Sequence, residues 1–364
     1  MSHATIDTAQ LGDSINRYGP TAGRAAPEGG VGQAKLATKT VDIHAHVMIP
    51  AGFDYMGPHM DVSKIAMVKH SNAETKSLNM QQDKDRTIAM TDIEDRMRVL
   101  DAQNIDFQVV APPPFQCWYQ SPVEHCVKGS QIVNDGLVEW VGRRPDRFAA
   151  MGTLPMTDPS EAISELERCM SMGMKGVQIL TNIDGEEIAS PRFEPVLKRA
   201  EELGALIMVH PNGFTHGDRF HDYYFANVMG NPLETTLAIG HLIFSGVMER
   251  LPNLKVLAVH GGGFLPAYSA RIDHAWGARQ DSHAKLPHPP TYYLRKMYFD
   301  SVVFSNHQLE YLVKTYGADK IVMGTDYPYD MADYDPVEHL VTTGISEEEK
   351  AAVGGLTAAA LLDL

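Results

Sequence analysis

The stretch Thr40-Val41-Asp42-Ile43-His44-Ala45-His46-Val47 decides how the rest of the chain is interpreted. Its β-branched and apolar residues alternate with polar ones, which predicts a β-strand. Because strand side chains alternate between two faces, His44 and His46 are expected on one face, with the intervening apolar residues on the other. Two imidazoles on one strand face are half of a divalent-metal site, and a hydrogen-bonded structural pair is the competing interpretation.

The composition indicates a globular protein with a sizeable core. Hydrophobic residues make up 44% and charged residues 21% of the 364 positions, and the net charge is −15. This acidic balance argues against a nucleic-acid partner, which requires clustered Lys and Arg. The sequence contains no apolar run of membrane-spanning length and no signal-peptide pattern at its start. Three cysteines without metal-ligand spacing indicate free thiols, so we expect a soluble cytoplasmic protein.

Two segments carry no regular hydrophobic period. Residues 1–36 are rich in Gly, Ala and Pro, and we expect an irregular N-terminal arm there. Residues 37–364 are expected to form the folded domain. Within this domain, the segment 51–90 is interpreted as a long loop or insert after the first strand, because loops of this length in compact domains are usually functional.

The remaining chain alternates between short apolar strands and helices. Strands are predicted at 41–47, 107–111, 148–152, 176–180, 205–210, 254–260, 297–300 and 321–324. Helices are predicted at 92–103, 123–143, from 157 onwards, and at 191–203, 233–249, 265–280, 306–316 and 346–364. Eight such repeats predict an α/β fold of the (β/α)8 TIM-barrel type in one domain. A doubly wound sheet is the competing fold, but no glycine-rich dinucleotide motif follows the first strand.

Ionisable residues recur where the predicted strands end. His44 and His46 lie in the first strand, and His210, His260 and Asp326 finish the fifth, sixth and eighth. Because the carboxyl ends of barrel strands meet at one mouth, these side chains are expected to converge there. A single strand histidine is more often structural, but this joint arrangement favours a metal site.

The same segments resemble the amidohydrolase superfamily. The motifs are Asp42-Ile43-His44-Ala45-His46, Val209-His210-Pro211, His260-Gly261-Gly262-Gly263 and Gly324-Thr325-Asp326-Tyr327-Pro328. They are most similar to the amidohydrolase-2 branch, typified by aminocarboxymuconate-semialdehyde decarboxylase and related to aromatic-acid decarboxylases. The resemblance extends from about Val41 to the C-terminus and is weakest in the 51–90 insert.

The resemblance implies one divalent metal, most often zinc with manganese as the alternative, held by His44, His46, His210 and Asp326. Three nitrogens and one carboxylate leave a position open for water or substrate. The fourth strand ends without the lysine that dinuclear relatives require, which favours a single ion. The family pattern assigns His260 an acid/base role beside the metal, together with Asp326.

The family pattern also suggests which residues bind the substrate. Arg271 corresponds to an arginine that grips a carboxylate. A second family arginine aligns with Lys84, and Arg86 two residues later is the nearest guanidinium. His221, in the loop after the fifth strand, is a further candidate for substrate contact. Asp300 is interpreted as either a structural partner or a catalytic group.

Taken together, these expectations describe a metal-dependent, non-oxidative decarboxylase in a catabolic pathway. Its substrate would be an aromatic, heteroaromatic or muconate-type carboxylic acid. The alternative is a metal-dependent hydrolase or hydratase of a ring-cleavage-type acid, because the motifs alone do not separate these reactions. A silent subunit of a larger complex ranks last, since no ligand is missing. The family resemblance further implies a homodimer.

Overall fold

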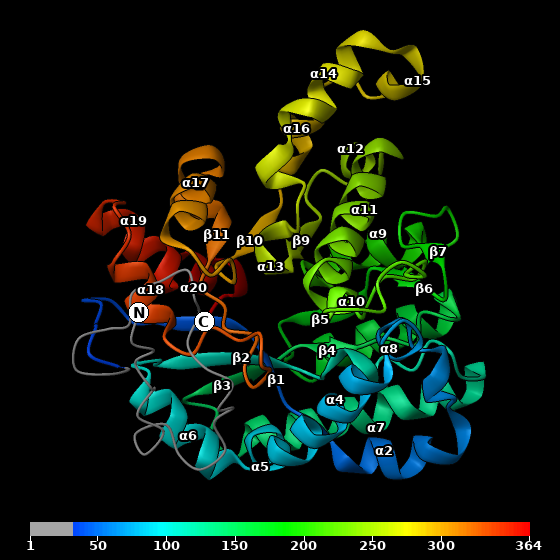
Figure 1. Cartoon of the computed structure of the whole chain (residues 1–364), viewed down its shortest axis with the longest axis vertical. Coiled ribbons are helices and arrows are strands. Elements are labelled where there is room, and N and C mark those ends of the chain that lie inside the picture. The colour runs from blue at the N-terminus through cyan, green and yellow to red at the C-terminus, as the bar shows by residue number, and fades with distance from the viewer. Residues whose placement is uncertain (1–31) are drawn as a thin grey trace.

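The computed structural model describes residues 32–364, and eight parallel strands form its centre (Figure 1). The third strand is interrupted at Met151, so it appears as two short pieces, β3 and β4. The barrel strands are β1 Val41–His46, β2 Phe107–Ala111, β3 Phe148–Ala150, β4 Gly152–Thr153, β5 Gly176–Leu180, β8 Leu206–His210, β9 Lys255–Ala258, β10 Tyr298–Asp300 and β11 Ile321–Val322.

Hydrogen bonds between neighbouring strands close the barrel. Pairing runs β1-β2-β3 in one sheet and β11-β10-β9-β8-β5-β4 in the other. Met151 joins the two sheets, because its N–H donates to the carbonyl of Val110 at 2.8 Å. On the opposite side, the N–H of Ile43 donates to the carbonyl of Met323 at 3.0 Å, and Ala45 bridges Tyr327. The predicted (β/α)8 barrel is therefore confirmed.

Helices follow the strands in the predicted order. The long ones are α6 Ile93–Ala102, α7 Val123–Gly142, α8 Pro159–Ser171, α9 Glu194–Leu203, α11 Gly230–Phe244, α14 Ala270–Ala278 and α17 Asn306–Tyr316. Shorter ones are η3 Pro114–Gln116, α10 Phe225–Val228, α12 Val247–Arg250, α13 Val259–Gly262, η4 Pro266–Tyr268, α15 Gln280–His283, α16 Pro290–Leu294 and η5 Ala318–Lys320. The C-terminal segment contains α18 Pro336–Val341, α19 Glu347–Ala351, the π-helical turn η6 Ala352–Leu356 and α20 Thr357–Leu362, and a small hairpin, β6 Asn182–Ile183 with β7 Glu186–Glu187, lies outside the barrel.

The insert after β1 is helical, so its interpretation as a long loop was wrong. It contains α2 Pro50–Met56, η1 Gly57–His59, η2 Val62–Lys64, α3 Ala66–Lys69, α4 Ala73–Asp85 and α5 Thr87–Thr91. The longest of these, α4, buries only Gln82, so no apolar stripe revealed it. Asn72 is the N-cap of α4, because its side chain accepts a hydrogen bond from the N–H of Thr75. In Figure 1, α2 packs beside α7.

The first strand departs from simple alternation. Its pairing with β2 shifts register between Asp42 and Ala45, which is the signature of a β-bulge. Ile43 consequently packs inside the barrel, in a cluster with Met208, Leu257 and Val322, rather than on the face opposite the histidines. Ala45 does face outward, where it contacts the cluster around Tyr327. The bulge thus places Ile43 among the apolar side chains that fill the barrel interior.

Other boundaries differ from prediction by a few residues. The sixth strand ends at Ala258, two residues before His260, and the eighth contains only Ile321 and Val322. Residues 32–36 are irregular, as predicted, and are held by Asn104, whose amide donates to the carbonyls of Gly32 and Ala34. The rest of the predicted arm, 1–31, lies outside the described residues.

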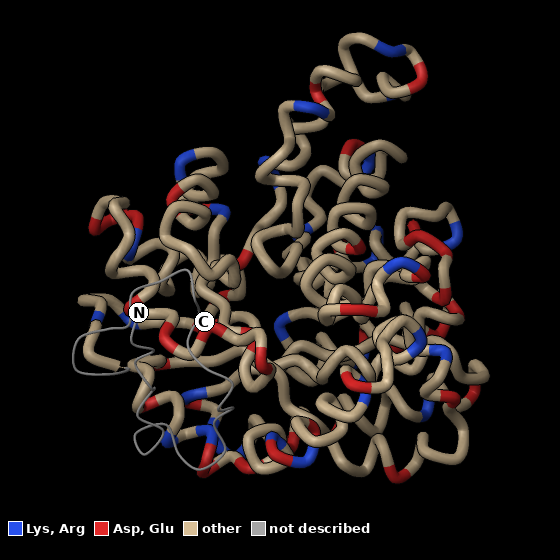
Figure 2. The backbone as a smooth tube through the Cα atoms, viewed as in Figure 1, with Lys and Arg blue, Asp and Glu red and all other residues tan. Residues whose placement is uncertain are grey.

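Two properties of the described chain concern partners. Lys and Arg are interspersed with Asp and Glu along the backbone, without an extended basic tract (Figure 2). Within residues 32–364, none of the helices combines the length and the apolar composition that crossing a bilayer requires.

Candidate metal centre and active-site pocket

Four imidazoles surround the Asp326 carboxylate at the carboxyl end of the barrel. Nε2 of His46 lies 3.1 Å and Nε2 of His44 lies 3.4 Å from Oδ1 of Asp326, and Nε2 of His210 lies 3.9 Å from the same oxygen. Nε2 of His260 lies 3.3 Å from Oδ2. The structure therefore brings together all five residues that the strand-end pattern predicted.

The other ring nitrogens of three histidines are held by oxygen acceptors. Nδ1 of His46 faces the carbonyl of Pro112 at 3.2 Å, and Nδ1 of His210 faces the carbonyl of Pro211 at 2.7 Å. Nδ1 of His44 faces Oδ2 of Asp300 at 2.7 Å. Because these oxygens only accept hydrogen bonds, each Nδ1 carries the proton, and each Nε2 presents its lone pair to the centre.

Asp300 connects two parts of the centre and is a positioning residue. Its side chain is fully buried. Besides His44, it accepts hydrogen bonds from the backbone N–H groups of His260 at 3.0 Å and Gly261 at 2.8 Å. The same carboxylate thus orients one imidazole and fixes the turn that carries another.

The turn after β9 has an unusual backbone. His260 has φ 55° and ψ 47°, which is the left-handed region, and Gly263 has φ 68°. A Cβ at Gly263 would lie 2.2 Å from the carbonyl oxygen of Pro232, so only glycine fits at this position. Asp326 also has a positive φ of 61°. Strained backbone of this kind clusters at functional sites, where the surrounding structure holds it in place.

The electrostatics of Asp326, His46 and His210 favour the protonation states that a metal requires, whereas for His44 the carboxylates of Asp326 and Asp300 outweigh the effect of burial and raise the pKa. Burial lowers the pKa of His210 to about 3 and also lowers the pKa of His46. Burial alone would raise the pKa of Asp326, but the imidazoles of His44, His210 and His260 outweigh it and hold that pKa well below its usual value. At neutral pH, Asp326 is therefore an anion, and His46 and His210 are neutral donors.

The residues fit a divalent metal ion. Nε2 of His44 and Nε2 of His210 are buried and have no hydrogen-bond partner among the described residues, although both point at Asp326. Donor atoms of His44, His210, His260 and Asp326 all lie within 4.8 Å of one another. Imidazole nitrogens with one carboxylate suit zinc, manganese or iron. The site can hold one divalent ion.

A cavity of about 170 Å³ opens beside this centre. Its lining includes His210, His260 and Asp326 together with Arg86, Tyr224 and Tyr329. Burial raises the pKa of the Tyr329 hydroxyl well above its usual value, so this phenol stays protonated. A neighbouring cavity of about 300 Å³ shares His260 and Asp326 with it.

Arg86 is the predicted substrate contact that the structure places in this cavity. Its side chain is 7% exposed, and its Cζ lies 4.9 Å from the centre of the Tyr329 ring. Nη2 pairs with Asp83, but Nη1 is buried without a hydrogen-bond partner among the described residues. Lys84, the residue that aligns with the family arginine, is exposed and does not line the cavity.

The structure does not bring the other two predicted substrate contacts into the cavity. Arg271 is exposed on α14, which projects from the barrel with α15 (top of Figure 1). His221 lies beside His70, with 5.8 Å between the ring centres, in a separate cluster. Within this chain, neither residue lines either of the two cavities at the metal centre.

Two residues of the site were missed by the sequence analysis. Tyr329 lies with its ring centre 5.2 Å from that of His46, and its position directly after the Asp326 motif was the available signal. Arg96 is fully buried and donates to the carbonyls of His46 and Ala89 and to the side chain of Gln108, each at 2.7 Å. An arginine on a helical face carried no such signal.

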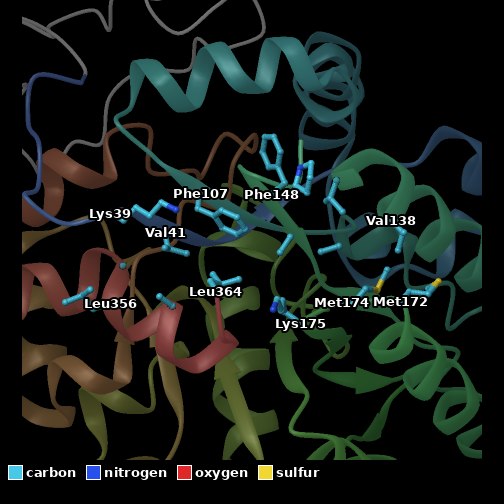
Figure 3. Close-up of a pocket in the computed structure, with 17 residues that line it drawn as sticks. Lys39, Val41, Phe107, Val138, Phe148, Met172, Met174, Lys175, Leu356 and Leu364 are labelled. Carbon is cyan, nitrogen blue, oxygen red and sulfur yellow. The ribbon is translucent and has the colours of Figure 1, made fainter. Parts of the chain in front are cut away.

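A further cavity of about 410 Å³ lies at the opposite, amino-terminal end of the strands (Figure 3). Apolar side chains such as Phe107 and Phe148 line it, with Lys39 and Lys175 among the few polar ones. None of the lining residues is a histidine, cysteine or acid. The cavity lacks metal ligands, and the chemistry belongs to the mouth formed by the carboxyl ends of the strands.

The amidohydrolase family model, in its second branch, matches residues 41–364. The chain belongs to the amidohydrolase family. This assignment agrees with the motifs around His44, His210, His260 and Asp326, all of which lie inside the matched range. The match also includes the helical insert between β1 and β2.

Similar proteins include named decarboxylases. The chain is 36% identical over 243 residues to 2-amino-3-carboxymuconate-6-semialdehyde decarboxylase of Dictyostelium discoideum, covering 66% of this chain and 68% of that protein. It is 26% identical over 302 residues to γ-resorcylate decarboxylase of Rhodococcus jostii, covering 76% and 89%. The fold is similar to 5-carboxyvanillate decarboxylase of Novosphingobium aromaticivorans, crystallised with manganese and a nitrobenzoic acid, with a TM-score of 0.76, 21% identity and coverage of 90% and 97%.

Proposed function

We propose that this protein is a metal-dependent, non-oxidative decarboxylase of an aromatic, heteroaromatic or muconate-type carboxylic acid. The observation that carries this proposal is the buried, unpartnered Nη1 of Arg86 in the same cavity as His210, His260 and Asp326. A buried guanidinium nitrogen that lacks an acceptor favours a ligand that supplies one, and a carboxylate oxygen is such an acceptor. The similar decarboxylases named above act on acids of this kind by their names.

The proposed metal ligands are His44, His46, His210 and Asp326, as the family resemblance implies. Their support is the common orientation of the three Nε2 lone pairs toward Oδ1 of Asp326. When bound, a divalent ion supplies positive charge that stabilises the negative charge developing on the substrate. Arg86 holds a substrate carboxylate, and the ring of Tyr329 forms part of the cavity wall beside it.

His260 is proposed as the acid/base residue. In contrast to the other three imidazoles, no hydrogen bond to a described residue holds its Nδ1, and its Nε2 lies 3.3 Å from Oδ2 of Asp326. This pair can hold a proton and deliver it to the carbon that bears the carboxylate. The carbon–carbon bond then breaks, its electron pair remains with the protonated ring or chain, and carbon dioxide leaves.

The test is the mass of the product after incubation of metal-loaded protein with hydroxylated aromatic, heteroaromatic and muconate acids. Loss of the mass of carbon dioxide from one acid is the expected result. Gain of the mass of water would instead establish the hydrolase or hydratase alternative. With the acid that loses carbon dioxide, His260→Ala should abolish turnover while the metal content stays unchanged. Unchanged turnover would refute the role of His260.

Arg86 and Lys84 form a matched pair for the substrate anchor. Arg86→Gln should raise KM for the acid by about tenfold or more, because a buried charge-assisted hydrogen bond contributes about 1.5–3 kcal/mol. Lys84→Gln, two residues away and exposed, should leave KM unchanged. Equal effects of both substitutions would show that general positive charge, rather than the buried guanidinium, attracts the substrate.

The identity of the ion is proposed as zinc, with manganese as the alternative. Zinc is supported by the nitrogen-rich donor set, and manganese by its presence in the similar 5-carboxyvanillate decarboxylase. Turnover of protein stripped with a chelator and reloaded with each ion separates the two. The higher kcat/KM at equal occupancy identifies the better cofactor.

We further propose a homodimer in the cytoplasm. The α14–α15 arm projects from the barrel (Figure 1) and carries the exposed Arg271, which supports a dimer in which this arm packs against the second copy. The free thiols of Cys117, Cys126 and Cys169 support a reducing compartment. If Arg271 binds substrate in the second copy, mixing inactive Arg271→Ala and His260→Ala chains should restore about a quarter of the wild-type activity, as random dimer exchange requires. No recovery would place Arg271 outside the shared site.

A further inference from the structure

A second group of metal-binding side chains lies away from the barrel mouth. It consists of His70 from the insert and Asp218 and His221 from the loop after β8, and their donor atoms all lie within 4.8 Å of one another. These three residues are called the rim cluster below. His70 directly follows α3, whereas Asp218 and His221 precede α10. The rim cluster therefore joins two segments that are far apart in the sequence.

His70 is a buried imidazole with one ring nitrogen whose lone pair is unused. It is 1% exposed, and its Nε2 lies 3.2 Å from the carbonyl of Thr215. Because a carbonyl only accepts hydrogen bonds, Nε2 carries the proton and Nδ1 presents a lone pair. Nδ1 has no hydrogen-bond partner among the described residues and lies 3.7 Å from Oδ1 of Asp218. A buried acceptor atom without a donor is costly, and a cation would satisfy it.

The backbone around the rim cluster is already held in place. The N–H of Asn72 donates to the carbonyl of His221 at 3.2 Å, and the N–H of Met67 donates to the carbonyl of Asn212 at 3.2 Å. The loop also passes directly over the imidazole, because a Cβ added to Gly217 would lie 2.8 Å from Cγ of His70. The two segments thus hold the three ligands close to a common point before any ion binds.

We propose that His70, Asp218 and His221 form a second metal site, for Zn²⁺, which ties the insert to the loop after β8 at the edge of the active-site cavity. Two imidazole nitrogens and one carboxylate oxygen, completed by water, are a tetrahedral zinc set. Asp218 is 87% exposed, so an ion can enter from solvent. This site goes beyond the proposed catalytic function, because it shares no residue with the barrel-mouth centre.

The position of the rim cluster gives the site a consequence. Met67 and Val68 of the insert, Asn212 and Tyr224 of the loop, and Asn227 of α10 line the cavity of about 170 Å³. Met67 and Val68 shortly precede His70 in the sequence, and the other three flank Asp218 and His221. An ion bound between the two segments would therefore restrain two walls of the active-site cavity. Bound metal stabilises the state it binds, so opening of the loop should become rarer when the site is filled.

The experiment measures how many zinc ions the full-length protein binds in equilibrium dialysis against Zn²⁺. The barrel-mouth site is loaded with zinc beforehand, so that it accounts for the first equivalent. Wild type is expected to bind two equivalents. Asp218→Asn and His221→Ala remove exposed side chains and should each weaken the second equivalent by more than about tenfold, since even loss of an outer-shell partner costs that much. The first equivalent should remain in both variants. His216→Ala, an exposed histidine of the same loop outside the cluster, is the matched control and should keep both equivalents.

A second measurement follows the loop itself. Hydrogen exchange of backbone amides at 212–229 should slow when Zn²⁺ is added to wild type and to His216→Ala, and should not respond in Asp218→Asn. A single bound equivalent in wild type would overturn the proposal, as would retention of two equivalents in both cluster variants. If His221→Ala changes KM while two equivalents stay bound, His221 contacts substrate instead, and the proposal is equally overturned.

Discussion

Replacing Asp300 by asparagine tests how the centre is built. The carboxylate accepts four hydrogen bonds, two at each oxygen. Oδ2 faces Nδ1 of His44 at 2.7 Å and the N–H of His260 at 3.0 Å, whereas Oδ1 faces the N–H groups of Gly261 at 2.8 Å and Val302 at 3.2 Å. Asparagine has the same shape but only one acceptor oxygen. Whichever way the amide turns, its NH₂ group must face two existing donors.

Both orientations weaken metal binding. If the NH₂ group faces His44, the imidazole must accept at Nδ1 and carry its proton on Nε2, which removes the lone pair that points at Asp326. If it faces Gly261, the turn that carries His260 is displaced. Loss of such an outer partner typically lowers metal affinity 10–100-fold, which is about 1.4–2.7 kcal/mol. We therefore expect Asp300→Asn to bind metal in that range below wild type, with turnover reduced at equal metal concentration.

The assay is competition between the protein and a chelator of known affinity, followed by metal analysis of the separated protein. Asp333→Asn is the matched control, because Asp333 and His339 form another buried pair with the same 2.7 Å contact. The control variant should lose folding stability without losing metal affinity. If Asp300→Asn folds and binds metal as tightly as wild type, the orienting role assigned to Asp300 is refuted.

Three further perturbations test the supporting structure. Gly263→Ala should lower the free energy of unfolding by about 1–3 kcal/mol and impair turnover. Gly277→Ala, where a Cβ meets nothing within 4 Å, should instead raise the free energy of unfolding by about 0.5–1 kcal/mol. Urea unfolding measures both changes. Arg96→Met should destabilise the fold by roughly 3 kcal/mol, because it leaves the buried carbonyls of His46 and Ala89 without a hydrogen-bond donor. A change below about 1 kcal/mol in the same assay would contradict this. Chelation should lower the Tm of wild type, by the equivalent of about 4 kcal/mol if free metal had been 1,000 times Kd, and His210→Ala should lose most of that shift in calorimetry.

Much of the architecture could be predicted because it depends on local patterns. Short apolar strands alternating with helices leave few topologies, and the barrel was confirmed together with nearly all of its predicted elements. Within this barrel, the position of a residue at a strand end places it at the mouth. That rule brought His44, His46, His210, His260 and Asp326 together correctly.

The insert shows where local patterns stop being informative. Helix α4 is polar on nearly all sides, so neither its existence nor its orientation is encoded in a hydrophobic stripe. At the C-terminal end of this helix, Arg86 turns inward over the Tyr329 ring and Lys84 stays in solvent, which is the reverse of what an ungapped alignment favours. The same limit applies to the bulge at Asp42–Ala45, because one shifted strand pair moves Ile43 to the barrel interior.

The sequence by itself determined the barrel and the metal-binding character of its mouth, because strand periodicity and strand-end positions are properties of short segments, and the resemblance of its motifs indicated the amidohydrolase branch. Only the tertiary structure decided that Asp300 orients His44, that Arg86 faces the cavity, and that His70 meets Asp218 and His221. These contacts join segments that are distant in the sequence. Their geometry depends on how whole elements pack, and no linear spacing records that packing.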